Sequence, residues 1–268
     1  MKITGQTDGA AQLKSLLQMQ QSQTEKLATA KRISTAADDA AGLQVAERLT
    51  SAVNGTVQGQ RNLYDGIGLA QVYEQSLQNI SDDLAGLSQL AIAAGNGIYT
   101  DADRGALQQQ ASGFLKNIEN TLQNSSFGGK PLFAAQASVD GAVAFNTGQS
   151  NVTLNISDVA AELNGQSLFD ISINNQSAAQ AATNTLAEVA EFVVALQAEA
   201  GASINSFAAQ ARSLNNQQVT QAAGRSRIED LDYAKALTEK TATDILSQSS
   251  TSVALQARMQ QQAALNLL

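Results

Sequence analysis

Two segments of the chain place apolar residues at alternating steps of three and four, and this spacing constrains the fold more than any other feature. On an α-helix such spacing lines the residues up in a narrow stripe along one side, as in coiled coils. We call the two stripes the seams. The first runs through Tyr73, Leu77, Ile80, Leu84, Leu87, Ala91 and Ala94, and the second through Leu186, Val189, Val193, Leu196, Ala200, Ile204, Phe207, Ala211 and Leu214.

Each seam needs an apolar partner, because an isolated stripe would expose its Leu and Ile side chains to water. A shorter helical segment, from Leu107 to Leu122, follows the first seam, and Thr100 and Asp101 are suited to cap it. The simplest arrangement is a mainly α protein, a long antiparallel helical bundle or coiled coil with both chain ends at the same end.

The middle of the chain, about residues 127–175, has a different pattern. VAFNTG and NVTLNIS alternate apolar and polar residues and are separated by a GQSN turn, while LFDISI alternates again. We therefore expect a small β-hairpin subdomain between the helical parts, with a further extended run at Leu168–Ile173.

The two ends of the chain are rich in Gln, Ser, Thr and Ala and poor in large apolar groups. Residues 1–33 and 235–268 would each bury little surface alone, so they are expected to gain order when many copies pack together. The apolar residues that remain are candidate assembly contacts: Leu13, Leu16, Leu27, Leu237, Ile245, Leu246, Val253 and Leu265.

Composition excludes several classes of function. The chain has no His and no Cys, so it cannot form a Ser-His-Asp or Cys-His nucleophile, a thiolate or imidazole zinc site, or a disulfide. A net charge of -8 disfavours nucleic-acid binding. No apolar run approaches the roughly 18 residues that span a bilayer. We predict no catalytic residue, no metal or cofactor, no nucleic-acid partner and no membrane insertion.

The sequence RISTAADDAAGL raises the question of a carboxylate site, because Asp38 and Asp39 are adjacent in it. Neighbouring helical residues point about 100° apart, so the two carboxylates cannot both face one ligand. Thr35 and Asp38 have the spacing of a capping box before Ala40. We therefore interpret Thr35, Asp38 and Asp39 as the restart of a helix. The acidic run Glu229–Asp232 follows Arg225 and Arg227, which indicates a local or intersubunit ion-pair network.

Motifs at both ends of the chain resemble those of bacterial flagellins. KRISTAADDAAGLQVAERLTSAVNG and QRNLYDGIGLAQVYEQSLQNISDDL are similar to the first part of that family, and SRIEDLDYA with TSVALQARMQQQAALNLL is similar to its end. SSFGGKPLF is similar to the turn that follows the second long helix of the family. The large variable outer domains of many members are absent between the hairpin region and Leu186.

The resemblance implies a structural subunit that polymerises into the flagellar filament used for motility. It implies an inner coiled-coil domain of residues 1–44 and 227–268, an outer bundle of residues 45–226, and a helix restart at the junction between them. It also implies export to the cell exterior without a cleaved signal peptide. The implied partners are copies of the same chain, an export chaperone, the export apparatus, and hook-associated junction and cap proteins.

Two alternatives and one departure accompany this interpretation. A hook-filament junction protein shares the terminal helices, and an inserted metalloprotease domain would need an H-E-x-x-H helix that a His-free chain lacks. The stretch from Leu84 to Ala93 has Gly86, Ser88 and Gln89 where flagellins sensed by the innate Toll-like receptor carry Arg, Arg and Glu. Because arginines supply much of the binding energy at interfaces, receptor recognition is expected to be weak.

Overall fold

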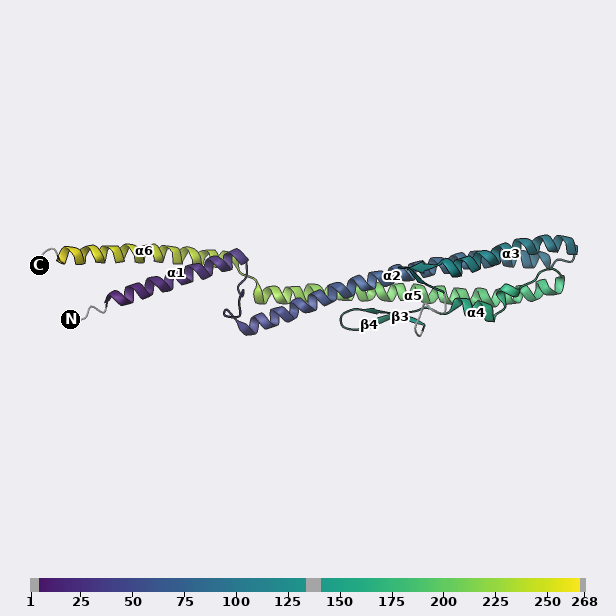
Figure 1. Cartoon of the computed structure of the whole chain (residues 1–268), viewed down its shortest axis with the longest axis horizontal. Coiled ribbons are helices and arrows are strands. Elements are labelled where there is room, and N and C mark those ends of the chain that lie inside the picture. Colours follow the sequence, from purple (N-terminus) through teal and green to yellow (C-terminus); the bar gives the residue numbers. More distant parts are fainter. Residues whose placement is uncertain (1–4, 134–140, 266–268) are drawn as a thin grey trace. The chain divides into compact units, whose positions relative to one another are not determined.

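The computed structural model describes residues 5–133 and 141–265, with side chains from Lys14 onward except those of residues 261, 264 and 265. Long helices dominate it, and short strands lie between the third and fourth helices (Figure 1). This confirms the predicted mainly α fold with a small hairpin region. The elements are α1 (Gly5–Thr29), α2 (Ala40–Ala94), α3 (Asp101–Asn124), β1 (Ser126–Phe127), β2 (Lys130–Pro131), β3 (Ala142–Asn146), β4 (Asn151–Asn155), α4 (Val159–Gly165), the 3-10 helix η1 (Leu168–Asp170), α5 (Gln176–Glu229) and α6 (Tyr233–Leu265).

The chain forms two compact units. Unit 1 consists of residues 1–53 and 219–268, and unit 2 consists of residues 54–218, so α2 and α5 each contribute to both. The predicted domain boundaries near residues 44 and 226 fall inside unit 1. Each unit is described separately below.

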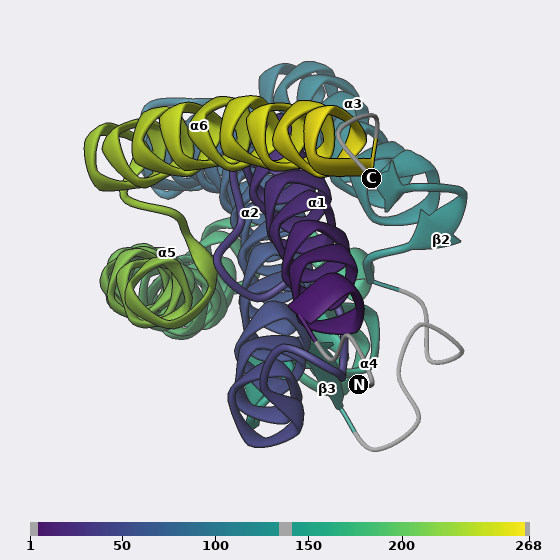
Figure 2. The ribbon, with the colours of Figure 1, turned by 90° about the vertical axis from the view of Figure 1, so that its left-hand side faces the viewer.

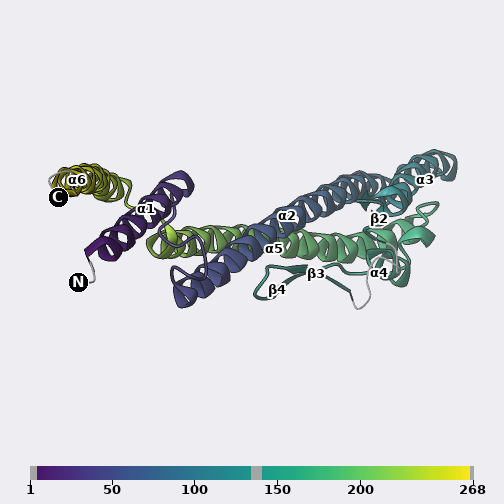
Figure 3. The same ribbon diagram turned by 60° about the vertical axis from the view of Figure 1, so that its left-hand side comes forward.

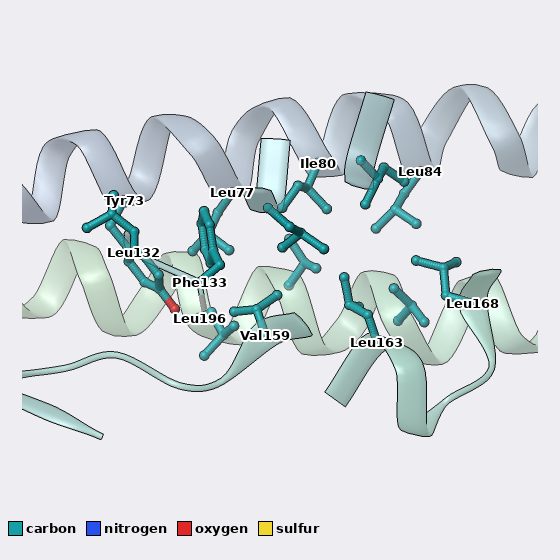
Figure 4. Packing of buried hydrophobic residues seen from close by; sticks show 14 of the residues in the cluster. Tyr73, Leu77, Ile80, Leu84, Leu132, Phe133, Val159, Leu163, Leu168 and Leu196 are labelled. Carbon is teal, nitrogen blue, oxygen red and sulfur yellow. The ribbon is translucent and has the colours of Figure 1, made fainter. Parts of the chain in front are cut away.

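The seams form the core of unit 2. Leu77, Ile80, Leu84 and Leu87 of α2 are buried, as are Leu186, Val189, Val193, Leu196, Phe207 and Leu214 of α5, while Ile204 is partly buried against them. Figure 4 shows Leu77, Ile80 and Leu84 of α2 facing a second set of side chains, which are Leu196 of α5, Val159 and Leu163 of α4, and Leu168 of η1. The rings of Tyr73 and Phe133 meet at 5.2 Å between centroids. The partner that each seam required is therefore supplied within the unit.

Helix α3 packs beside the distal part of α2, and α4 lies beside α5 (Figure 3). Thr100 caps α3 with a full capping box, in which its side chain accepts from the Asp103 N–H and the Asp103 carboxylate accepts from the Thr100 N–H. The predicted cap at Thr100 is thus confirmed. Between α2 and α3, the buried Arg104 donates from Nε to Ala94 O at 2.8 Å and from Nη2 to Asn96 O at 3.0 Å. Its guanidinium satisfies carbonyls at the C-terminal end of α2, which have no partner within the helix.

The middle segment agrees with the prediction only in part. The predicted hairpin forms between β3 and β4, which pair Ala142 with Asn155 through to Asn146 with Asn151, and β1 pairs with β2 in a second, shorter hairpin that was not predicted. The extended run predicted at Leu168–Ile173 is wrong, because η1 occupies Leu168–Asp170. The sequence pattern also missed α4, which Asp158 caps by accepting from the Ala161 N–H and which buries Val159 and Leu163 one turn apart.

Unit 1 contains the antiparallel pair α1 and α6. Figure 1 shows the two helices closest at the ends where they join the rest of the unit and separated toward the chain ends, and Figure 2, seen from the chain ends, shows them crossing at an angle. The N-terminal end of α1 and the C-terminal end of α6 lie at the same end of this pair, as the bundle interpretation requires. The helix predicted from Ile228 begins instead at Tyr233, because the non-helical residues 230–232 separate α5 from α6.

Candidate assembly surfaces

The predicted helix restart is a short connector between α1 and α2, and its hydrogen bonds converge on Asp38. Asp38 Oδ2 accepts from the Ser34 and Thr35 N–H groups, each at 3.1 Å, and from both hydroxyls. Its Oδ1 lies 2.9 Å from Lys26 Nζ in the last turn of α1. Because one carboxylate ties the end of α1 to the turn that precedes α2, it sets the path of the chain between the two helices.

Asp39 has a separate role. Its Oδ1 accepts from the Gly42 N–H at 2.9 Å and its carbonyl accepts from the Leu43 N–H at 2.9 Å, so Asp39 is the residue that caps α2. The capping box assigned to Thr35 is wrong. Thr35 donates to Asp38 through its hydroxyl instead of accepting, since residues 35–38 form a turn of their own and α2 begins only at Ala40.

A second connector, between α5 and α6, runs alongside the connector between α1 and α2. Lys31 and Asp230 form an isolated antiparallel bridge; the Arg32 N–H donates to Glu229 O at 2.7 Å and the Leu231 N–H donates to Ala30 O at 3.0 Å. The nearly buried Glu229 forms an ion pair with Lys31 and approaches Arg225 at 4.0 Å. The acidic run therefore contributes to a network within the chain, and its second aspartate, Asp232, caps α6 through the Lys235 N–H.

The charges at this junction favour ionised Asp38. Lys26 is the largest influence that holds the pKa of the Asp38 carboxyl well below its usual value, and the N–H groups of Ser34 and Thr35 act in the same direction. Similarly, Lys240 and Gln20 lower the pKa of Asp244 on α6. Both carboxylates are therefore charged at any physiological pH.

The contact between α1 and α6 uses polar and small residues. Gln20 of α1 donates from Nε2 to Asp244 Oδ1 at 2.5 Å, and Lys240 Nζ lies 2.7 Å from the other oxygen of the same carboxylate. Thr243 is the residue of α6 that is most buried among those described, at 6% exposed. Leu16 and Leu27 of α1 are only partly buried.

The large apolar side chains of α6 instead face water. Ile245 is 59% exposed and Val253 is 64% exposed, and the other predicted contacts Leu237 and Leu246 are also at least half exposed. Leu255 and Met259, which the prediction did not include, share this exposure. The side chains of Leu13 and Leu265 lie outside the described residues. Exposed apolar residues gathered on one helix mark a surface that a partner covers.

Other kinds of site find no support in the described residues. No three Asp or Glu side chains there are grouped so that they could hold a metal ion. Among the helices that the structure describes, none combines the length and hydrophobicity needed to cross a bilayer. The geometry defines a class of protein, an elongated-helix subunit with an uncovered apolar helix at its termini.

Comparisons with known proteins identify the family. The sequence profile of the bacterial flagellin N-terminal helical region matches residues 10–138, and that of the bacterial flagellin C-terminal helical region matches residues 188–268. A flagellar filament 30.7 kDa core protein of Treponema maltophilum is 30% identical over 261 residues, which cover 92% of each chain. The chain belongs to the bacterial flagellin family.

Other relatives are much longer. A flagellin of Escherichia coli O127:H6 is 32% identical over 162 residues, which are 60% of this chain but 29% of that protein. Among solved structures, a Bacillus cereus flagellin has a TM-score of 0.50 at 20% identity and covers 59% of this chain and 88% of its own. A Vibrio parahaemolyticus protein described as flagellar hook-associated has a TM-score of 0.54 at 15% identity, covering 72% and 97%. These two structures share the fold.

Proposed function

We propose that this chain is a structural subunit that polymerises with copies of itself into the flagellar filament used for motility. The observation that carries the proposal is the exposed apolar side of α6, centred on Ile245, Leu246 and Val253, next to an α1–α6 contact that is polar. Each such side chain contributes on the order of 1.5 to 3 kcal/mol when a neighbour buries it fully. Packing between copies therefore supplies the stability that the terminal helices lack alone.

This proposal implies two domains, an inner terminal-helix domain (1–44 and 227–268) and an outer bundle (45–226). The junction between them consists of the residues around Asp38 and the Lys31–Asp230 bridge. Family membership also supports extracellular localisation in the flagellum, reached through the export apparatus without a cleaved signal peptide. The export chaperone and the hook-associated junction and cap proteins complete the proposed set of partners. The proposed role is structural and includes no catalysed reaction.

The test is polymerisation of the purified chain with filament seeds. Wild type should form filaments seen by electron microscopy, whereas Ile245→Ser with Val253→Ser should stay monomeric with an unchanged circular dichroism spectrum. Gln248→Ala, an exposed change on the same helix, is the matched control and should assemble normally. A wild type that stays monomeric at high concentration with seeds, or a serine variant that assembles as well as wild type, contradicts the proposal.

A hook-associated junction protein is the second candidate, favoured by the fold shared with the Vibrio parahaemolyticus protein. The 92% coverage of a filament core protein argues for the filament. Immunogold labelling of the native flagellum separates the two candidates, because a filament subunit labels the whole length and a junction protein labels only the base.

A further inference from the structure

A groove in unit 2 has the features of a docking site for a second copy of the chain. It has a volume of about 370 Å³ and lies between α2 and α5. Tyr64, which is 57% exposed, and Arg212 line it together with the small residues Ala208 and Ala211. The remaining lining residues are Gln60, Ile67, Asn215 and Asn216. An exposed Tyr beside an Arg, over small residues, is typical of the anchoring part of a protein interface.

Charge indicates what the groove accepts. Residues 54–218 contain 14 Asp and Glu but only 5 Lys and Arg, and Arg212 is the only cation on the part of α5 that belongs to unit 2. No carboxylate lines the groove, and Arg212 makes no ion pair within the described part of the chain. An acid-rich unit repels its copies everywhere except at such positions, so Arg212 selects where a neighbour docks.

The same unit presents a matching acidic segment higher on α5, made of Glu188, Glu191 and Val194. The two glutamates lie one turn apart, and in the described structure neither side chain has a hydrogen bond or ion pair. Val194, 55% exposed, follows one turn later. Most other acids of the unit are engaged: Asp82 accepts from Gln78, Glu119 from Gln123 and Glu199 from Asn155. Exposed alanines beside the segment allow close approach of a neighbour.

We propose, on the basis of the filament function proposed above, that the segment Glu188–Val194 of one copy docks in the Tyr64–Arg212 groove of the next. Glu191 then pairs with Arg212 and Val194 covers the ring of Tyr64. The 21 residues that separate Glu191 from Arg212 on one helix correspond to about 32 Å. The contact joins two different surfaces, so when successive copies run parallel each added copy presents a free surface to the next and the contact propagates without closing.

Cysteine cross-linking tests the contact directly, because the natural chain has no cysteine. The variant Ala195→Cys with Asn215→Cys keeps Glu191 and Arg212 and places one thiol beside each surface. The two positions are about 30 Å apart within a chain, beyond the reach of a short bismaleimide reagent. Filaments treated with the reagent should yield a ladder of linked chains on a denaturing gel, and each single-cysteine variant should not. Filaments that give no ladder, or dimers only, overturn the proposal.

Charge exchange provides a second measurement. Arg212→Glu and Glu191→Arg should each raise the critical concentration for assembly about fivefold or more, and the double variant should return it toward the wild-type value. Lys116→Glu, an exposed reversal on α3, is the matched control. A double variant no better than either single one, or an equal effect of the control, overturns the pairing. A wild type that forms no filaments rejects the proposed function instead, so the two failures are distinguishable.

Discussion

Lys26 at the end of α1 and Asp38 in the connector to α2 form an ion pair, with 2.9 Å between Nζ and Oδ1. The same carboxylate accepts from the Ser34 and Thr35 backbone N–H groups at 3.1 Å. One ionised side chain thus neutralises a lysine of α1 and satisfies two donors that no helix reaches. The geometry of the connector between α1 and α2 therefore depends on the charge of Asp38.

Stability of unit 1 should therefore depend on pH in a defined direction. The pKa of Asp38 is lowered from its usual 3.8, first by Lys26 and then by the two N–H donors. A lowered folded pKa stabilises the fold fully above the unfolded value, and this contribution is lost as the pH falls below 3.8 toward the folded value. Asp38→Asn should unfold more easily than wild type in urea at neutral pH, and the difference should shrink in acid.

Asp103 and Asp244 also have lowered pKa values. The wild type and Asp38→Asn both contain these two residues, so their contribution cancels in the comparison. A difference between wild type and Asp38→Asn that is the same at neutral pH and in acid would show that charge is not the cause.

Replacing Thr35, Asp38 and Asp39 together with Ala should weaken assembly or alter filament shape. The variant loses the tie to Lys26 and the cap on Gly42, while the seams of unit 2 are untouched. The measurement is electron microscopy of seeded filaments, with circular dichroism of the monomer as a control on folding. Normal filaments from this variant would count against a role of the junction in assembly.

Two glycines one turn apart on α2 should respond oppositely to the same substitution. A Cβ on Gly59 would lie 2.1 Å from Thr147 O, in the turn between β3 and β4, whereas a Cβ on Gly55 would meet nothing within 4 Å. Gly59→Ala should destabilise the protein by roughly 1 to 3 kcal/mol because the hairpin must move. Gly55→Ala should stabilise it by about 0.5 to 1 kcal/mol. Urea denaturation measures both, and equal effects would contradict the close approach.

Arg104→Met should destabilise the turn between α2 and α3 by roughly 1 to 3 kcal/mol, since the carbonyls of Ala94 and Asn96 lose a charged donor. Arg104 donates to Ala94 O and Asn96 O, whereas its ion-pair partner Asp101 is 93% exposed. Asp101→Asn is the matched control and should change stability by less than about 0.5 kcal/mol. Thermal denaturation of both variants checks this, and a larger loss for Asp101→Asn would mean that the ion pair matters more than the carbonyl contacts.

Receptor recognition should be weak. The side chain of Phe114 leaves no room at Gly86, where a Cβ would lie 2.7 Å from Cζ of that ring. Ser88 is partly buried and Gln89 is exposed. In a cell line that reports Toll-like receptor activation, the filament protein should give a low signal, and Ser88→Arg with Gln89→Glu should raise it. Strong activation by the wild type would reject this expectation.

How far the sequence predicted each part depends on the range of the interactions involved. The seams from Leu77 to Leu87 and from Leu186 to Leu214 were predicted residue by residue, because helical periodicity is local and the burial of a stripe needs only a partner of the same kind. The cap at Thr100 was predicted for the same reason. Leu168–Ile173 was predicted as extended because alternation over six residues does not separate a strand from a short helical turn packed on a core.

The spacing in the sequence pointed to the junction residues Thr35, Asp38 and Asp39. It assigned the helix cap to Thr35, whereas Asp39 caps α2. Asp38 binds Lys26, twelve residues away, and Glu229 binds Lys31 across almost the whole sequence. No local pattern specifies such pairs, because only the folded chain brings the charges together. The burial of Arg104 and the polar contact between Gln20 and Asp244 were missed for this reason.

The sequence by itself determined that the chain is helical, that its seams pair, that it has no imidazole or thiol chemistry, and that its terminal motifs are those of flagellins. These properties follow from local periodicity and from residue identity, which need no third dimension. Tertiary structure decided which residues the terminal helices bury and which they expose. Thr243 is buried while Ile245 and Val253 face water, because α6 packs against α1 through contacts such as Gln20 with Asp244, which join residues far apart in the sequence.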